Sequence, residues 1–175
     1  MSILIAKQGH GDSLCGIYSL VNAFYHLEGI TSQSQQVDKD IFDNASREIF
    51  KSIVLVAEDL GLIDTEHLLG GYEPAELVKV FNEFCCRSQY AIRAEHVMVA
   101  LARTGQSDAN EAARKLNGVI VAYSDDLDHY FVKLADGQIV DSWPTTLATS
   151  KTKLDLKSSL VIFPLQTGAT HAQTH

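Results

Sequence analysis

The chain has 175 residues, of which 46% are hydrophobic and 21% are charged, and its formal net charge is −8. This length suffices for one domain that buries about 70% of the surface of the unfolded chain, so the core needs neither a metal nor a disulfide. An acidic chain without a cluster of Lys and Arg argues against nucleic acid or an anionic membrane as a partner.

The predicted helices lie in the first two-thirds of the chain. A short apolar run over residues 2–6 is expected to be a strand or the segment that leads into the first helix. Apolar residues then recur at helical spacing up to Tyr25, with Asp12 or Ser13 suited to cap this helix and Gly29 to end it. The same spacing, with helix-starting and helix-ending residues, predicts further helices over 46–60, from 73 to about 84, over 94–103 and over 108–116.

The last third of the chain has the composition of strands. Runs rich in β-branched and aromatic residues predict strands over 119–123, 129–134, 138–143 and 160–164, in addition to a strand over 90–93 near the middle of the chain. Helices followed by consecutive strands predict an α+β fold, with the helices on one side of an antiparallel sheet. We expect a single domain over residues 1–165 and a disordered polar tail over 166–175.

The cysteines and the N-terminal residues predict a reducing compartment. Cys85 and Cys86 are adjacent and would pair only in a strained ring, and Cys15 has no evident partner. The start MSILIAKQG lacks the basic region and the long apolar run of a signal peptide. We therefore expect a cytoplasmic protein, with non-classical secretion as an effector left open. No apolar run reaches the roughly 18 residues that a membrane-spanning helix needs.

Two nucleophiles lie two positions apart in the sequence GDSLCG of residues 11–16. Cys15 begins the first predicted helix, where the helix dipole favours a thiolate, and an imidazole partner can lower the pKa of such a thiol to about 3–4. The backbone N–H of Cys15 can donate to an oxyanion, and Gln8, seven residues earlier, can supply a second donor. Gly16 leaves room for a substrate beside the sulfur.

A hairpin in the last third predicts the partners of this cysteine. The sequence of residues 134–137 is typical of a type I turn with Gly137 in the left-handed position of a bulge. The turn pairs Leu134 with Gln138, and the same register makes Asp141 the diagonal cross-strand neighbour of His129.

This register brings an acid and a base together. His129 is the candidate base, and Asp141 is the carboxylate that would orient its imidazole. Trp143 would lie opposite His129 and shield the pair from water. No set of His, Cys, Asp or Glu residues has the spacing of a metal site.

The order Gln8, Cys15, His129 and Asp141 resembles the papain-like cysteine hydrolases. Asp-Ser-Trp at 141–143 is similar to the Asn-Ser-Trp of papain. The helix that begins with GDSLC, together with HYFVKLADGQIVDSW, resembles the Josephin deubiquitinases. Processing-peptidase domains of bacteriocin exporters and effector proteins that deamidate glutamine also look similar. The likeness covers residues 8–24 and 117–144.

The resemblance implies a papain-like fold and hydrolysis of an amide bond in a protein or peptide through a thioester, without a cofactor. Cys15 would be the nucleophile, His129 the base and Asp141 its orienting carboxylate. Gln8 would bind the oxyanion, while Gly16 and Trp143 would line the substrate site. Peptidases, isopeptidases, glutamine deamidases and transglutaminases share this machinery, so ubiquitin-like and host proteins are substrates to test.

Two other functions remain open from the sequence. Gly-Asp-Ser-Leu at 11–14 matches the motif of GDSL serine esterases, with Ser13 as nucleophile, and Asp126 and His129 match the DxxH of that family. Members of that family have a parallel sheet and a GxND block. This chain has no GxND block, and it ends in consecutive strands. A papain-like fold kept as a binding module is the second alternative. Without a catalytic role, Ser13 is a helix cap, and we expect Cys85 and Cys86 in the core.

Overall fold

The structure, a computed structural model, describes residues 14–28, 39–63, 71–142, 149 and 151–165. The apolar run over 2–6 and the tail over 166–175 lie outside these residues. The helices are α1 (Cys15–Leu27), α2 (Lys39–Asp59), α4 (Pro74–Arg87), α5 (Val97–Thr104) and α6 (Ala109–Lys115). The strands are β1 (Ile92–His96), β2 (Val119–Ser124), β3 (His129–Lys133), β4 (Ile139–Val140) and β5 (Asp155–Pro164).

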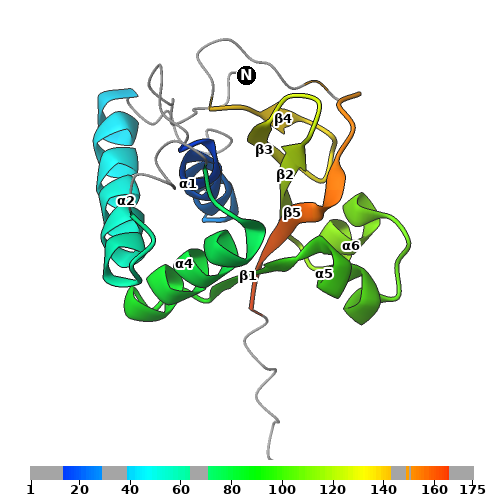
Figure 1. The fold of residues 1–175 in the computed structure, drawn as a ribbon, viewed down its shortest axis with the longest axis horizontal. Coiled ribbons are helices and arrows are strands. Elements are labelled where there is room, and N and C mark those ends of the chain that lie inside the picture. Colours follow the sequence, from blue (N-terminus) through cyan, green and yellow to red (C-terminus); the bar gives the residue numbers. More distant parts are fainter. Residues whose placement is uncertain (1–13, 29–38, 64–70, 143–148, 150, 166–175) are drawn as a thin grey trace, which may run out of the picture.

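The five strands form one antiparallel sheet in the order β1-β5-β2-β3-β4. Helices α1, α2 and α4 precede the first strand in the chain and lie together beside the sheet (Figure 1), whereas α5 and α6 come between β1 and β2. The α+β class predicted from the sequence is confirmed.

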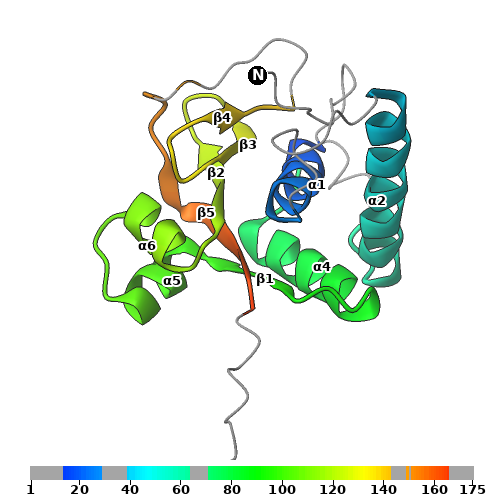
Figure 2. The same cartoon turned by 180° about the vertical axis from the view of Figure 1, so that it is seen from behind.

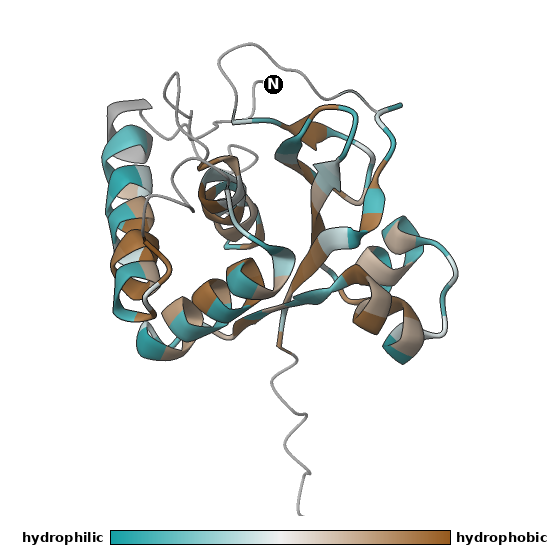
Figure 3. Ribbon diagram, viewed as in Figure 1, coloured by the Kyte–Doolittle hydropathy of each residue, from teal (hydrophilic) through white to brown (hydrophobic). Residues whose placement is uncertain are grey.

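Helices cover both faces of the sheet, so the prediction of a one-sided arrangement is wrong. α1, α2 and α4 lie on one face, whereas α5 and α6 lie on the other (Figure 2). The reason is visible in β2, where Val119 and Val121 join the core on the first face while Ile120 and Ala122 join the core on the second. Continuous apolar strands of this kind need a cover on each side. Figure 3 shows the hydrophobic residues along these central strands.

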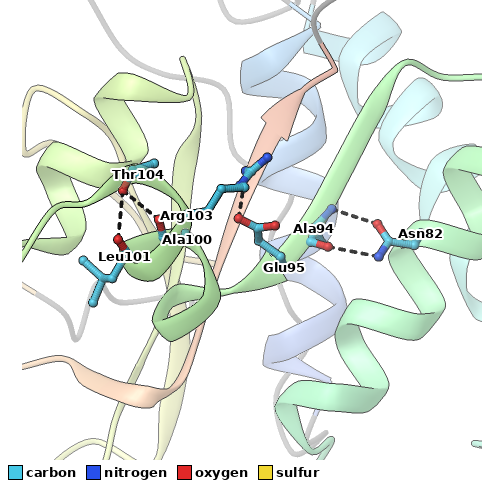
Figure 4. Close-up of polar contacts among 7 residues, drawn as sticks. All are labelled: Asn82, Ala94, Glu95, Ala100, Leu101, Arg103 and Thr104. Carbon is cyan, nitrogen blue, oxygen red and sulfur yellow. Dashed lines mark hydrogen bonds and ion pairs between the residues drawn. The ribbon is translucent and has the colours of Figure 1, made fainter.

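Strand β1 extends further than the sequence predicts, so the helix expected over 94–103 begins later. Ala94 pairs with Ile162 of β5, and α5 begins at Val97. Asn82 of α4 satisfies the other edge of β1, because its Oδ1 accepts from the Ala94 N–H at 2.8 Å and its Nδ2 donates to the Ala94 carbonyl at 3.0 Å (Figure 4). The side chain thus takes the place of a further strand at the sheet edge.

An ion pair and a ring contact fix α5 on the sheet. Arg103 donates to Glu95 of β1 at 2.8 Å (Figure 4), and its guanidinium lies 4.5 Å from the centre of the Phe163 ring of β5. Helix α2 also differs from its prediction, because it begins at Lys39 rather than at residue 46. Among the described residues, the helices are too short or too polar to cross a membrane.

Candidate active site

The hairpin formed by β3 and β4 has the register that its turn predicts. Val132 pairs with Val140, and the Leu134 N–H donates to the Gln138 carbonyl at 2.9 Å. Gly137 has a φ of +87°, the left-handed conformation expected at this position. β4 itself ends at Val140, which is shorter than the predicted strand over 138–143.

This register brings His129 and Asp141 into contact. His129 is the first residue of β3, and Asp141 directly follows β4. The Nε2 atom of His129 lies 2.8 Å from Oδ1 of Asp141, and the two residues are 2% and 0% exposed. A carboxylate in this place holds the imidazole ring in one orientation and leaves Nδ1 for another partner.

Cys15 is the candidate for that partner. It is the first residue of α1, is half-buried and is a free thiol. Its side chain lies close enough to the imidazole of His129 to be one of the two groups that raise the pKa of that ring. The residue before it, Leu14, occupies the N-cap position without a side-chain hydrogen bond to the helix, and the predicted caps Asp12 and Ser13 lie outside the described residues. The positive end of the α1 dipole therefore lies at the sulfur.

The charge of His129 follows from these contacts. Burial lowers the pKa of its imidazole, but the hydrogen bonds and charges of Asp141 and Cys15 outweigh burial and raise the pKa to about 9. His129 is therefore an imidazolium at neutral pH. An imidazolium beside the cysteine supplies a positive charge near the sulfur and a proton for a leaving group.

Two tyrosines lie beside His129 and Cys15, and they were not predicted from the sequence. The rings of Tyr123 on β2 and Tyr130 on β3 have centroids 4.9 Å apart. Burial, followed by the charge of Cys15, raises the pKa of Tyr130. The alternation of β2 and β3 was the available signal, because it puts both tyrosines on the face that α1 covers.

Two buried hydroxyls flank the His–Asp pair. Ser124 pairs across the strands with His129, and Ser142 follows Asp141 in the chain. Both serines are 0% exposed, and neither hydroxyl has a hydrogen-bond partner among the described residues.

The structure gives Gly16 a packing role. The residue is buried, and a Cβ atom added to it would lie 3.0 and 3.1 Å from the two terminal carbons of Leu77 on α4 and 3.5 Å from the Tyr130 ring. The glycine thus permits the close approach of α1 to α4, and its contribution to substrate binding stays a prediction. Gln8 and Trp143 lie outside the described residues, so their predicted roles stay predictions too.

The carboxylate that the esterase alternative needs is not the one bound to His129. Asp126 is exposed in the turn before β3, whereas the Nε2 atom of His129 contacts Asp141. The sheet is antiparallel, unlike the parallel sheet that the alternative predicts. Ser13 lies outside the described residues.

The other two cysteines differ from each other. Cys85 is 2% exposed in the core of α4, as expected, and burial followed by the charge of Glu28 raises its pKa to about 12. Cys86 is exposed, so its predicted place in the core is wrong, because it lies on the outer face of the same helix. Within the described ranges, no cluster of His, Cys, Asp and Glu could hold a metal ion.

The described residues thus define an α+β protein in which a helix-terminal cysteine adjoins a buried His–Asp pair. Comparisons with protein-family models, with curated proteins and with solved structures give no match. Function has to be inferred from the chemistry of these side chains.

Proposed function

We propose that the protein is a cysteine-dependent hydrolase of papain-like type that acts on an amide bond of a protein or peptide. The observation that carries the proposal is the contact of His129 Nε2 with Asp141 Oδ1 at 2.8 Å, combined with the influence of Cys15, at the N-terminus of α1, on the pKa of the same imidazole. A nucleophile, a base within reach of it and a group that orients the base are the three parts of such a site. The nucleophile at the N-terminus of α1 supports the papain-like arrangement.

The reaction proceeds in two steps. The Cys15 sulfur attacks the carbonyl carbon, and the C–N bond breaks as His129 gives its proton to the departing nitrogen. The acyl group remains on the sulfur as a thioester. Water then attacks the thioester, His129 accepts a proton from the water, and the carboxylic acid leaves as the sulfur is restored.

The remaining groups stabilise charge and geometry. Asp141, fully buried, keeps the ring of His129 in one orientation and stabilises its positive charge. The backbone N–H of Cys15 lies at a helix N-terminus and is suited to donate to the oxyanion, with the Gln8 side chain as the proposed second donor.

The leaving group distinguishes the activities that share this chemistry. Release of an amine indicates a peptidase or isopeptidase, whereas release of ammonia from glutamine indicates a deamidase. We would incubate the protein with a fluorogenic peptide panel, a ubiquitin conjugate and glutamine-containing proteins monitored for ammonia. We expect turnover in one of these assays, lost in Cys15→Ala and His129→Ala and kept in the matched variant Cys86→Ser.

Two results would overturn the proposal. One is turnover that survives in Cys15→Ala but is lost in Ser13→Ala, which would identify a serine enzyme. The other is the absence of turnover in all three assays together with a Cys15 thiol no more reactive than that of exposed Cys86, which would favour a binding module.

A further inference from the structure

The turn before His129 contains a backbone conformation that needs support. Asp128 has a φ of +47°, in the left-handed region that L-residues other than Asn and Asp seldom adopt. It immediately precedes His129, the first residue of β3. The conformation of Asp128 therefore sets the direction in which the chain enters β3. It also sets the direction in which the side chain of His129 points.

A tyrosine side chain holds Asp128. The hydroxyl of Tyr123 donates to Oδ1 of Asp128 at 2.5 Å. This hydrogen bond is the first cause of the raised pKa of Tyr123, followed by burial and the charge of Asp128. A hydrogen bond between a neutral donor and a carboxylate is among the stronger ones in proteins.

Tyr123 is itself fixed from the opposite side of β2. The pairing of β2 with β5 shifts register between Val121 and Tyr123. Ser159, fully buried, bridges the irregularity, because its Oγ accepts from the Tyr123 N–H at 3.0 Å and donates to the Asp155 carbonyl at 2.6 Å. Irregularities of this kind re-aim a side chain and are common beside active sites.

The ring of Tyr123 also faces the site. It packs on Tyr130, its cross-strand partner, with 4.9 Å between the ring centroids. Tyr123 packs against the core on the face of the sheet that α1 covers, and the charge of Cys15 is the last of the causes that raise its pKa. β5, Tyr123 and Asp128 thus form a continuous chain of contacts that ends at His129.

We propose that Tyr123 is a positioning residue, whose hydroxyl fixes Asp128 in the left-handed conformation and so aims His129 at Cys15 and Asp141. The inference rests on the proposed function, since it assigns a support to the base of that reaction. It differs from the proposed function in making the reactivity of the cysteine depend on a phenol that contacts neither the sulfur nor the imidazole through a hydrogen bond.

The test compares Tyr123→Phe with the wild type in two measurements that need no substrate. One is the rate at which iodoacetamide labels Cys15, and the other is the imidazole pKa of His129 by NMR. Loss of the hydrogen bond is expected to slow labelling about 3- to 10-fold. The imidazole pKa should fall from about 9 towards 6.5, because Asp141 and Cys15, the titratable groups that raise it, are less well aligned.

Three variants control the interpretation. Tyr90→Phe removes a hydroxyl from a ring that packs on Phe24 and Phe84, away from the site, and should change neither measurement. Asp128→Asn keeps an acceptor and a residue that tolerates the left-handed region, so it should stay close to the wild type. Asp128→Ala should resemble Tyr123→Phe, and the double variant should be no slower than the slower single one, because both remove the same interaction.

A Tyr123→Phe variant with the rate and imidazole pKa of the wild type would overturn the proposal, as would additive effects in the double variant. Thermal unfolding checks that each variant is folded. If Tyr123→Phe does not fold, Asp128→Ala, at an exposed position, provides the same comparison. If the wild-type Cys15 reacts no faster than Cys86, the proposed function fails, whereas the NMR titration still decides whether Tyr123 positions His129.

Discussion

At the scale of single residues, the two partners of His129 raise the pKa of its imidazole although burial lowers it. Burial lowers the pKa of the imidazole, and Asp141 is the first of the groups that raise it. Asp141→Asn keeps the shape and a hydrogen-bond acceptor but removes the charge. We expect the imidazole pKa of this variant to fall by about 1–3 pH units, as for the loss of an opposite charge in contact.

NMR titration of the histidines measures this change. Asp126→Asn is the matched control, because Asp126 is an exposed carboxylate three residues before His129. A fall in the imidazole pKa for Asp126→Asn but not for Asp141→Asn would contradict the assignment and favour the carboxylate that the esterase alternative uses.

The raised pKa of His129 also makes stability depend on pH. The folded pKa of about 9 lies above the ordinary value of 6.5, so protonation favours the folded state. The resulting stabilisation is complete below about pH 6.5 and is lost as the pH rises through about 9. From the two pKa values, it amounts to on the order of 3 kcal/mol.

Urea unfolding of the wild type and of His129→Gln at a series of pH values tests this sign. We expect the difference in unfolding free energy between the two proteins to shrink as the pH rises from about 6.5 to above 9. A difference that stays constant, or that grows over this interval, would mean that folding does not raise the pKa of the imidazole.

At the scale of elements, the position of Cys15 depends on how closely α1 approaches α4. Replacing a helical Gly by Ala ordinarily stabilises a helix by about 1 kcal/mol. At Gly16 the added methyl would meet the terminal carbons of Leu77 at 3.0 and 3.1 Å, and Leu77 is fully buried. We therefore expect the opposite sign, a destabilisation of about 1–3 kcal/mol from overpacking.

The free energy of unfolding of Gly16→Ala measures this effect, and labelling of Cys15 shows whether the helix start moves. Adding Leu77→Val to Gly16→Ala should recover part of the lost stability, since it removes a methyl from the crowded place. A Gly16→Ala variant as stable as the wild type or more stable would show that the close approach is unimportant.

The elements differ in how far the sequence predicts them. The hairpin of β3 and β4 was predicted in register, because its turn is local chemistry in which Gly137 adopts a left-handed conformation. The predicted start of α5, at residue 94, was wrong. Ala94 instead pairs with β5 and with Asn82, and both partners come from distant parts of the chain. Intrinsic helical tendency is weak beside such pairing.

At the scale of the whole molecule, the sheet separates two helical layers. The site lies where α1 of one layer meets β3 and the residue after β4, so three separate segments supply Cys15, His129 and Asp141. The sequence predicts these three residues, because the chemistry of each side chain suits one role.

The second helical layer and the supports of the site were not predicted. The helix-then-strand order favours helices on one side of the sheet, whereas β2 contributes apolar residues to the cores on both faces. Tyr123 and Asp128 were missed because their importance comes from a positive φ and from one tertiary hydrogen bond. Neither of these features leaves a motif in the sequence.

The reactivity of the three cysteines tests the central claim most directly. All three are free in the structure, with Cys85 buried and Cys86 exposed, so one experiment contains its own references. Limiting iodoacetamide with peptide mapping between about pH 4 and 9 gives the labelling rate of each thiol. We predict that Cys15 reacts fastest, continues to react below pH 7 and is slowed in His129→Ala. Labelling of Cys15 at the rate of Cys86 and only above about pH 8, unaffected by His129→Ala, would contradict an activated cysteine.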